Sequence, residues 1–400
     1  MQIRSGPCAA AGLLLSLLVA TSATAQTRAE EVAKQQGEKA HHLTPYKPNA
    51  AEMFLDQIEH GKWFIGTPRG WYPTFGSIYP GGGLTGGLGY RHYIGYDSYI
   101  DAGALSSIGG DKKIQILAST PDHLDGRLDL MSAVGWIDGT RRPYYGLGNE
   151  SDKAQFTTYR ITHGFAEGAA LLRPVKWLRL RVNGGLDDYD QRRATGTGRP
   201  IDAVFTPATA PLLGGNPRYL RGEVSAAAYW LESPGYSRRG GLYRFAYEEF
   251  NPLEEGGTFG FVRTEVVQHL PIRRESWVVS LRARTESIVR KSDVVPFFLM
   301  PSLGGGNSIR GYLTERFRDR HALLMSSELR WFPNRLGLDM AFFADAGKVA
   351  PLRTGLTFDR MRTDVGIGMR FHTPTSTVLR LEVARGWEGL RFVFATSSPF

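Results

Sequence analysis

Glutamate and arginine side chains two residues apart recur in four segments between residues 263 and 382. On an extended strand, residues two apart lie on the same face, so each pair is within reach of an ion-pair contact. Paired carboxylates can also perform general acid and base catalysis, but here an arginine accompanies every glutamate and favours an ion-paired lining. These residues are Glu265, Glu286, Glu328 and Glu382, with Arg263, Arg284, Arg330 and Arg380.

Other residues with catalytic or ligand-binding chemistry do not occur in a typical arrangement. His41 and His42 are adjacent and point to different faces of any regular element, which does not suit a metal site. Residues 81–89 are rich in glycine but lack the Lys-Ser/Thr of a phosphate-binding loop, and the sequence has no Gly-x-Ser-x-Gly elbow. We therefore expect a protein that is not an enzyme and that has no cofactor or metal.

The elements that position these charges are β-strands with two different faces. Near residue 178, for example, Leu178 and Leu180 alternate with Arg179 and Arg181, and such a period of two predicts a strand. An apolar face with tryptophans near the strand ends is typical of a membrane barrel with an aromatic girdle, and disfavours a soluble sandwich. These tryptophans are Trp71, Trp136, Trp177, Trp230, Trp277, Trp331 and Trp387.

The pattern predicts sixteen strands, an even number that returns both ends of the barrel to the same side of the membrane. Short connections such as Asn334-Arg335 alternate with longer ones such as 190–218 and 290–320, as periplasmic turns alternate with extracellular loops. We therefore predict an all-β fold, a sixteen-stranded antiparallel transmembrane β-barrel over residues 69–400. The expected strand centres lie near residues 75, 89, 103, 116, 132, 165, 183, 225, 246, 264, 282, 327, 343, 366, 380 and 394.

The N-terminal residues 1–25 have the three parts of a secretory signal peptide. Arg4 supplies positive charge, residues 9–20 form a short apolar core, and Ala23 and Ala25 form an Ala-x-Ala cleavage site. Residues 26–68 are polar, and we expect a short, partly disordered periplasmic lead.

Composition excludes two further classes of protein. Cys8 is the only cysteine and lies in the predicted signal peptide, so a disulfide framework is excluded. The formal charge is +9, but the arginines are scattered singly, so nucleic acid is not an expected partner.

The C-terminal segment, residues 390–400, is predicted to be the last membrane strand. Leu390, Phe392 and Phe394 are in phase with the terminal Phe400. An aromatic residue at the end of a lipid-facing strand looks like an outer-membrane assembly signal. We therefore expect Phe400 to carry that signal, and the protein to lie in the outer membrane of a Gram-negative cell.

Four spaced motifs resemble those of the BamA/TamA-like bacterial surface antigen family, and the resemblance covers about residues 70–400. The central one is Ile309-Arg310-Gly311-Tyr312, which follows a glycine-rich segment. The others are Tyr144-Tyr145-Gly146-Leu147-Gly148-Asn149, Glu328-Leu329-Arg330 and Phe343-Ala344-Asp345-Ala346-Gly347.

The resemblance implies that residues 290–320 fold back into the barrel lumen and plug it. Arg310 is then expected to contact Asp345 on the inner wall, with Glu328 as a second acceptor. The alternation of residues places Asp345 and Phe343 inward and Phe342 toward lipid. A charge-assisted contact shielded within a barrel is expected to hold the loop in place.

The family also implies a function, which is to help insert or translocate proteins or lipids at the outer membrane. The implied partners are outer-membrane lipid, unfolded outer-membrane or secreted client proteins, and a periplasmic partner. The segment before the first expected strand is too short for a POTRA module, the periplasmic domain usual in the family, so a stand-alone barrel is expected. The alternative is a passive pore or structural barrel without assembly activity.

Overall fold

The computed structural model describes residues 68–399, apart from 82, 195, 197, 234, 255, 273–275, 290–293, 334–336 and 374–376. Several predictions therefore lie outside the described residues. These are the signal peptide 1–25, the lead up to residue 67, the His41-His42 doublet, the turn at Asn334-Arg335, and Phe400.

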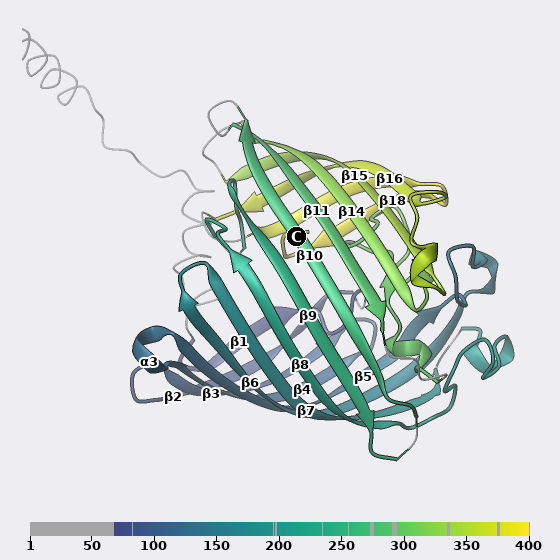
Figure 1. Ribbon diagram of the computed structural model, residues 1–400, viewed down its shortest axis with the longest axis horizontal. Coiled ribbons are helices and arrows are strands. Elements are labelled where there is room, and N and C mark those ends of the chain that lie inside the picture. Colours follow the sequence, from purple (N-terminus) through teal and green to yellow (C-terminus); the bar gives the residue numbers. More distant parts are fainter. Residues whose placement is uncertain are drawn as a thin grey trace, which may run out of the picture. The chain divides into compact units, whose positions relative to one another are not determined.

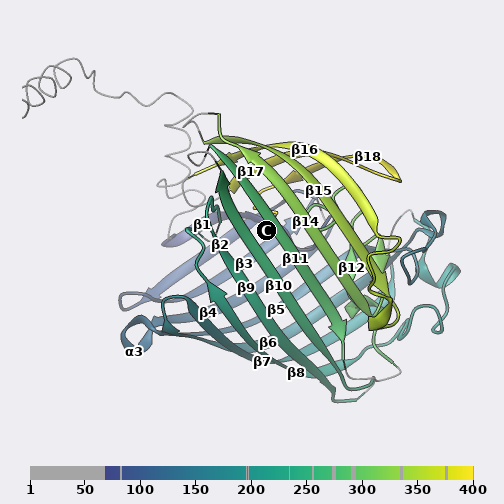
Figure 2. The ribbon, with the colours of Figure 1, turned by 45° about the horizontal axis from the view of Figure 1, so that its top comes forward.

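Sixteen strands form one antiparallel sheet in which neighbours in the chain are neighbours in space (Figures 1 and 2). Every predicted strand centre falls within one of them, so the predicted number and order of strands are confirmed. The strands are β1 (Gly70–Gly76), β2 (Thr85–Ile94), β3 (Ser98–Ser107), β4 (Lys112–Asp122), β5 (Leu128–Tyr144), β6 (Thr157–Val175), β7 (Leu178–Arg193), β8 (Arg218–Tyr229), β9 (Gly240–Pro252), β10 (Phe259–Ile272), β11 (Trp277–Ile288), β14 (His321–Trp331), β15 (Leu338–Ala350), β16 (Arg362–His372), β17 (Thr377–Gly386) and β18 (Gly389–Ala395).

The sheet curls strongly, and its two faces differ in polarity as the alternation predicts (Figures 1 and 2). On β15, Asp339 and Asp345 are buried on the inner face, whereas Phe342 on the outer face is 47% exposed. Exposed apolar side chains also cover the outer face of the other strands, among them Leu88, Ile116, Val134, Val182, Val224, Phe245, Leu281, Val365, Ile367 and Phe392. Among the described residues, no helix is long and apolar enough to cross a membrane.

Short connections lie at one end of the strands, the turn end, and longer ones at the other, the loop end. The turn end holds the connections that follow β2, β4, β6, β8, β10, β14 and β16, among them 95–97, 123–127 with the short α3 (His123–Gly126), and 176–177. At the loop end lie the longer segments 145–156, 194–217, 289–320 and 351–361, with shorter ones between them.

Most of the tryptophans in the described part of the chain lie near the turn end, as expected of a girdle. Trp177 and Trp230 are exposed there, and Trp277 stacks on Trp331 at 5.8 Å between ring centroids. Trp136 is an exception because it lies in the middle of β5. Its predicted place near a strand end is wrong, because β5 extends well beyond the stretch of clear alternation.

An aromatic core fills the inner face near the loop end. Phe297, in the short 3-10 turn Phe297–Leu299, packs its ring 4.8 Å from that of Tyr144 and 4.9 Å from that of Tyr159. Phe205, from the 194–217 segment, packs against the other side of Tyr144 at 4.8 Å. The two longest connections therefore bury their own aromatic side chains against the inner face.

The last strand is shorter than predicted. β18 ends at Ala395, so residues 396–399 do not continue the sheet. The carbonyl oxygen of Pro399 instead accepts a hydrogen bond of 3.0 Å from Nη1 of Arg282 on β11. The outward phase of Phe392 and Phe394 is confirmed, since they are 77% and 64% exposed.

Candidate functional site

The loop between β11 and β14 makes a tight turn that presents Arg310 to the inner face. Gly304 and Gly305 have φ of 118° and 93°, conformations that favour glycine. A Cβ on Gly304 would lie 2.1 Å from the carbonyl oxygen of Leu313. The Ser308 hydroxyl accepts a hydrogen bond from the backbone N–H of Gly304 at 3.2 Å. A two-stranded pair, β12 (Ser302–Leu303) with β13 (Phe317–Arg318), closes the base of this turn.

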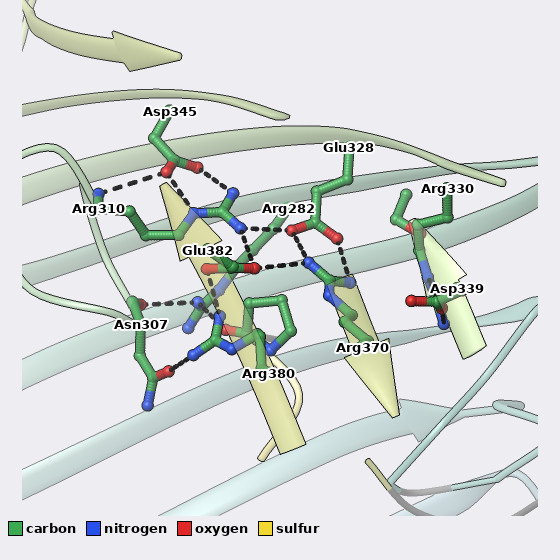
Figure 3. A network of polar contacts seen from close by, with 12 residues as sticks. Arg282, Asn307, Arg310, Glu328, Arg330, Asp339, Asp345, Arg370, Arg380 and Glu382 are labelled. Atoms are coloured by element: carbon green, nitrogen blue, oxygen red, sulfur yellow. Dashed lines mark hydrogen bonds and ion pairs between the residues drawn. The ribbon is translucent and has the colours of Figure 1, made fainter. Parts of the chain in front are cut away.

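Arg310 is 1% exposed, and its guanidinium binds carboxylates from three strands (Figure 3). Nε and Nη2 donate to the two oxygens of Asp345 at 2.7 and 2.9 Å, a bidentate contact. Nη1 donates to Glu328 at 2.6 Å and to Glu382 at 3.2 Å. The expected contact of Arg310 with Asp345 is therefore present, and Glu328 is a second acceptor.

The Arg310 guanidinium also stacks on the ring of Phe343. Its Cζ lies 3.4 Å from the ring centroid. Room for the ring comes from Gly366 on the neighbouring strand, where a Cβ would lie 2.3 Å from Phe343. Aromatic contact on one face and carboxylates around the edge fix the plane of the guanidinium.

Two further arginines join Arg310 and its carboxylate partners into one buried network. Arg370 donates to both oxygens of Glu328 at 2.8 and 2.6 Å and to Glu382 at 3.0 Å. Arg380 pairs with Glu382 at 3.4 Å and donates to the side chain of Asn307 in the loop at 2.8 Å. Each buried charge thus faces an opposite charge, which offsets its loss of hydration.

Side chains on either side of Arg310 hold the turn by apolar contact. Ile309 and Tyr312 are buried in a cluster with Leu303, Phe317 and other apolar residues of β14 and β15. The Tyr312 hydroxyl donates to the carbonyl oxygen of Thr363 at 3.1 Å. Anchoring therefore combines ion pairs at Arg310 with apolar packing at its neighbours.

Gly311 allows the closest approach of the loop to the wall. Its N–H donates to Asp364 at 2.8 Å, and an added Cβ would lie 2.6 Å from both the Cβ of Asp364 and the backbone nitrogen of Gly386.

We expect Gly311→Ala to destabilise the folded protein by about 1–3 kcal/mol, because backbone must shift to accommodate the methyl group. The measurement is the midpoint of thermal unfolding, followed by heat-modifiable migration on gels. Gly222→Ala is the matched control, since a Cβ there meets no atom within 4 Å. Equal midpoints for the two variants would contradict the close contact.

The early motif, residues 144–149, contacts the loop between β11 and β14 (residues 289–320, the central loop) and the neighbouring strand β16. The N–H of Gly148 donates to the carbonyl oxygen of Arg318 at 2.8 Å, and Arg362 donates to the carbonyl oxygen of Asn149 at 2.8 Å. The Arg316 guanidinium lies over the Tyr145 ring at 4.9 Å. Burial raises the pKa of the Tyr145 phenol to about 12, so this ring stays neutral beside the arginine. The four motifs, far apart in sequence, thus meet on one side of the sheet.

Sequence reasoning missed several residues of this network. It assigned Glu382 to the lining but not to Arg310, and it did not single out Arg370 or Asn307. The register of strands pairs Arg370 with both Asp339 and Arg380, which brings it into the network. The alternation of residues indicates that Arg370 faces inward. Its partners could not be predicted, because they depend on the strand register. Phe400, the expected assembly signal, lies outside the described residues.

Comparison with known proteins agrees with the motifs. Residues 231–388 match the Omp85 superfamily domain. No curated protein matches the sequence. Among solved structures, the chain is similar to the crystal structure of BamA from Haemophilus ducreyi lacking POTRA domains 1–3. The TM-score is 0.60 and the identity 14%, over 82% of this chain and 69% of that one.

A second similar structure is CdiB from Acinetobacter baumannii, with a TM-score of 0.50 and 11% identity. The match covers 79% of this chain and 57% of the CdiB chain.

The fold is a sixteen-stranded antiparallel sheet, and Arg310 anchors a loop on its inner face. Within that fold, residues 231–388 match the Omp85 superfamily domain, and this match confirms the resemblance that the motifs indicate.

Proposed function

We propose that the protein is an outer-membrane β-barrel that assists the insertion or translocation of proteins. In this proposal the wall closes between β1 and β18, and residues 289–320 plug the lumen. The protein performs no chemical step of its own. Outer-membrane lipid, unfolded outer-membrane or secreted client proteins, and a periplasmic partner are the proposed partners.

The polarity of the sheet supports a membrane location. Its outer face carries exposed apolar and aromatic side chains, and its inner face carries buried ion pairs. In water, such an outer face would be a large apolar patch of a size that soluble monomers rarely expose. In a bilayer the same face is stabilised by lipid.

The observation that carries the proposal is the pair of sheet edges. In the described part of the chain, β1 and β18 stand at the two ends of the strand order, and each has only seven residues. A sheet edge presents N–H and C=O groups to which another extended chain can add. A seam between two short strands has few hydrogen bonds, so it opens at lower cost than the long β5–β6 pair.

The superfamily match supports protein clients as the substrate class. BamA and CdiB both resemble the chain in fold, and the Omp85 domain is the shared element. The inner face favours an assembly factor over an open pore, because buried ion pairs and aromatic contacts hold the central loop.

A reconstitution experiment tests the proposal. The purified protein is placed in lipid vesicles, and a urea-unfolded outer-membrane β-barrel client is added. Folding of the client is followed by heat-modifiable migration on gels. We expect faster folding than in protein-free vesicles, and a matching fall in outer-membrane protein levels when the protein is depleted from cells. Unchanged client folding in the vesicles, together with unchanged outer-membrane protein levels after depletion, would contradict the assembly role.

The charged inner face favours a second candidate, a passive pore or structural barrel. Arg221 and Arg263 form a ladder of ion pairs with Glu167, Asp187, Glu248 and Glu286 along β6–β11, a lining that suits water. Single-channel conductance separates the two candidates. A plugged barrel passes small, flickering currents, whereas an open pore passes large and steady ones.

A further inference from the structure

Five neighbouring strands, β10, β11, β14, β15 and β16, lie side by side in Figure 2, and a hollow of about 560 Å³ crosses their outer face. Every residue that lines the hollow lies in the described part of the chain. Exposed apolar side chains form its rim, and these are Val266, Leu281, Met325 and Val365. The hollow therefore belongs to the outer face and not to the lumen.

Small side chains form the floor of the hollow. Ser327 on β14 stands directly opposite Ala344 on β15, so two small residues meet in the middle of this face. The small apolar residues of the floor are Ala283, Ala344 and Ala346. The next row toward the turn end is large and exposed, and it contains Leu329, Phe342 and Ile367. A row of small side chains beside a row of large ones leaves a furrow across the strands.

The hollow is about as long as one leaflet of a membrane is deep. On β16 it includes Thr363, near the loop end of that strand, whereas on β10 it reaches Gln268, nearer the turn end. Neighbouring strands lie about 4.8 Å apart, so five strands give it a length of roughly 19 Å. The hydrocarbon core of a bilayer is about 30 Å thick, and one leaflet is therefore about 15 Å deep. An extended acyl chain that crosses one leaflet obliquely fits the hollow in length.

The wall behind the hollow carries the anchor of the central loop. Asp345 and Asp364 alternate with lining residues along β15 and β16, and their side chains are buried on the inner face. There Asp345 binds the Arg310 guanidinium, and Asp364 accepts the N–H of Gly311. The sheet is a single layer, so an occupant of the hollow packs against the back of the strands that hold the loop.

A lysine lies beyond the loop-side end of the hollow. Lys348 follows Ala346 by two residues on β15, so both side chains project from the outer face. The Lys348 Nζ donates to the Thr357 hydroxyl at 2.8 Å and to the carbonyl oxygen of Asp359 at 2.7 Å, and neither acceptor carries a charge. The Asp359 carboxylate pairs with Arg360 instead. The Lys348 ammonium is thus placed to attract a lipid phosphate at this end of the hollow.

We propose that the hollow is a lipid-binding site, which takes one acyl chain of a phospholipid and places the phosphate beside Lys348. Close packing against the floor holds the chain, since burial alone gives no gain where the surroundings are lipid. A bound chain also supports the strands that carry Asp345 and Asp364 from behind. The proposal rests on the proposed function only in taking the outer face as membrane-facing.

Photolabelling tests the site. The purified protein is placed in vesicles of phosphatidylethanolamine that contain a phosphatidylglycerol probe with a diazirine in the middle of one acyl chain. After illumination, labelled residues are located by peptide mass spectrometry. We expect labelling of the hollow to exceed that of the outer face of β8, at Val224 and Ala226, about tenfold, the ratio that corresponds to a binding preference of about 1.4 kcal/mol.

Ala344→Phe fills the hollow. The ring takes the space opposite Ser327, so labelling of the hollow should fall to the level of β8. Ala226→Phe is the matched control, because Ala226 is also exposed on the outer face but does not border the hollow. Heat-modifiable migration verifies folding, and Ser327→Phe on the facing strand gives the same test if Ala344→Phe does not fold. Equal labelling of the hollow in the filled variant and the control would contradict the site.

A probe without phosphate tests the role of Lys348. Diacylglycerol with the same diazirine chain should label the hollow less than the phosphatidylglycerol probe does, and Lys348→Gln should remove that difference. Arg360→Gln is the control, since it removes an exposed cation of the same end of the sheet. If the two probes label the hollow of the natural chain equally, the contact between phosphate and Lys348 is wrong.

The outcomes separate the site from the proposed function. Labelling spread evenly over the outer face would overturn the site and leave the membrane location standing. Labelling that spares the hollow alone would mean that a protein, such as a second copy of the chain, covers it, and the lipid site would be wrong. If no outward residue is labelled, the membrane location fails as well. If the hollow is labelled as expected but the natural chain never accelerates client folding, the site stands and the assembly role falls.

Discussion

Replacing Arg310 with alanine is expected to release the central loop from the inner face and to cost about 3–5 kcal/mol of docking free energy. The physical reason is that Asp345, Glu328 and Glu382 would then remain buried with one fewer cation among them. Measured outcomes are faster protease cleavage within residues 304–318 from the loop side and more frequent channel openings.

A double-mutant cycle with Asp345 sharpens this prediction. Asp345→Ala should be milder than Arg310→Ala, because Glu328 and Glu382 still bind the guanidinium. The double variant should be little worse than Arg310→Ala alone, since the two residues act as one contact. Arg360→Ala serves as the control, with a side chain that is 76% exposed. Additive effects of the two single changes would contradict a shared contact.

Strand positions were predictable because the environment on the two sides of the sheet is so different. Leu178 and Leu180 alternate with arginines, and a slip of one residue would turn arginines outward. The prediction weakened where alternation stops. Trp136 lies in the middle of a strand that continues to Tyr144, and Pro399 folds inward past the end of β18.

The candidate site was predictable in part, and mainly through the family resemblance. Residue types and phase placed Asp345 and Phe343 inward, but only the resemblance linked them to Arg310. Arg370 and Asn307 required the strand register and the path of the loop, which single-sequence patterns do not specify. The burial of Tyr236 and Ser237 gave no signal in the sequence, because these residues in a short polar segment are typical of an ordinary turn.

The structure also reveals that the central connection is held at two separate places. Arg310 and its carboxylates form one anchor, and Phe297 in the aromatic core forms the other. Arg318 lies between them and donates to the carbonyl oxygen of Phe297 at 2.9 Å and to Glu315 at 2.6 Å. A segment tied at two points re-docks quickly when only one contact opens, because the remaining contact keeps it close.

Combining Phe297→Ala with Arg310→Ala is therefore expected to have the largest effect on the channel. Phe297 is fully buried, and its truncation alone should cost about 3–5 kcal/mol while Arg310 keeps the loop inside. Each single variant should show brief openings. The double variant should show long-lived openings with a conductance well above the sum of the two, as the loop leaves the lumen. Phe358→Ala is the control for phenylalanine loss, because its side chain is 76% exposed in the 351–361 connection. If the double variant merely adds the effects of the singles, the two contacts do not restrain one plug, and the lumen is closed by something other than this loop.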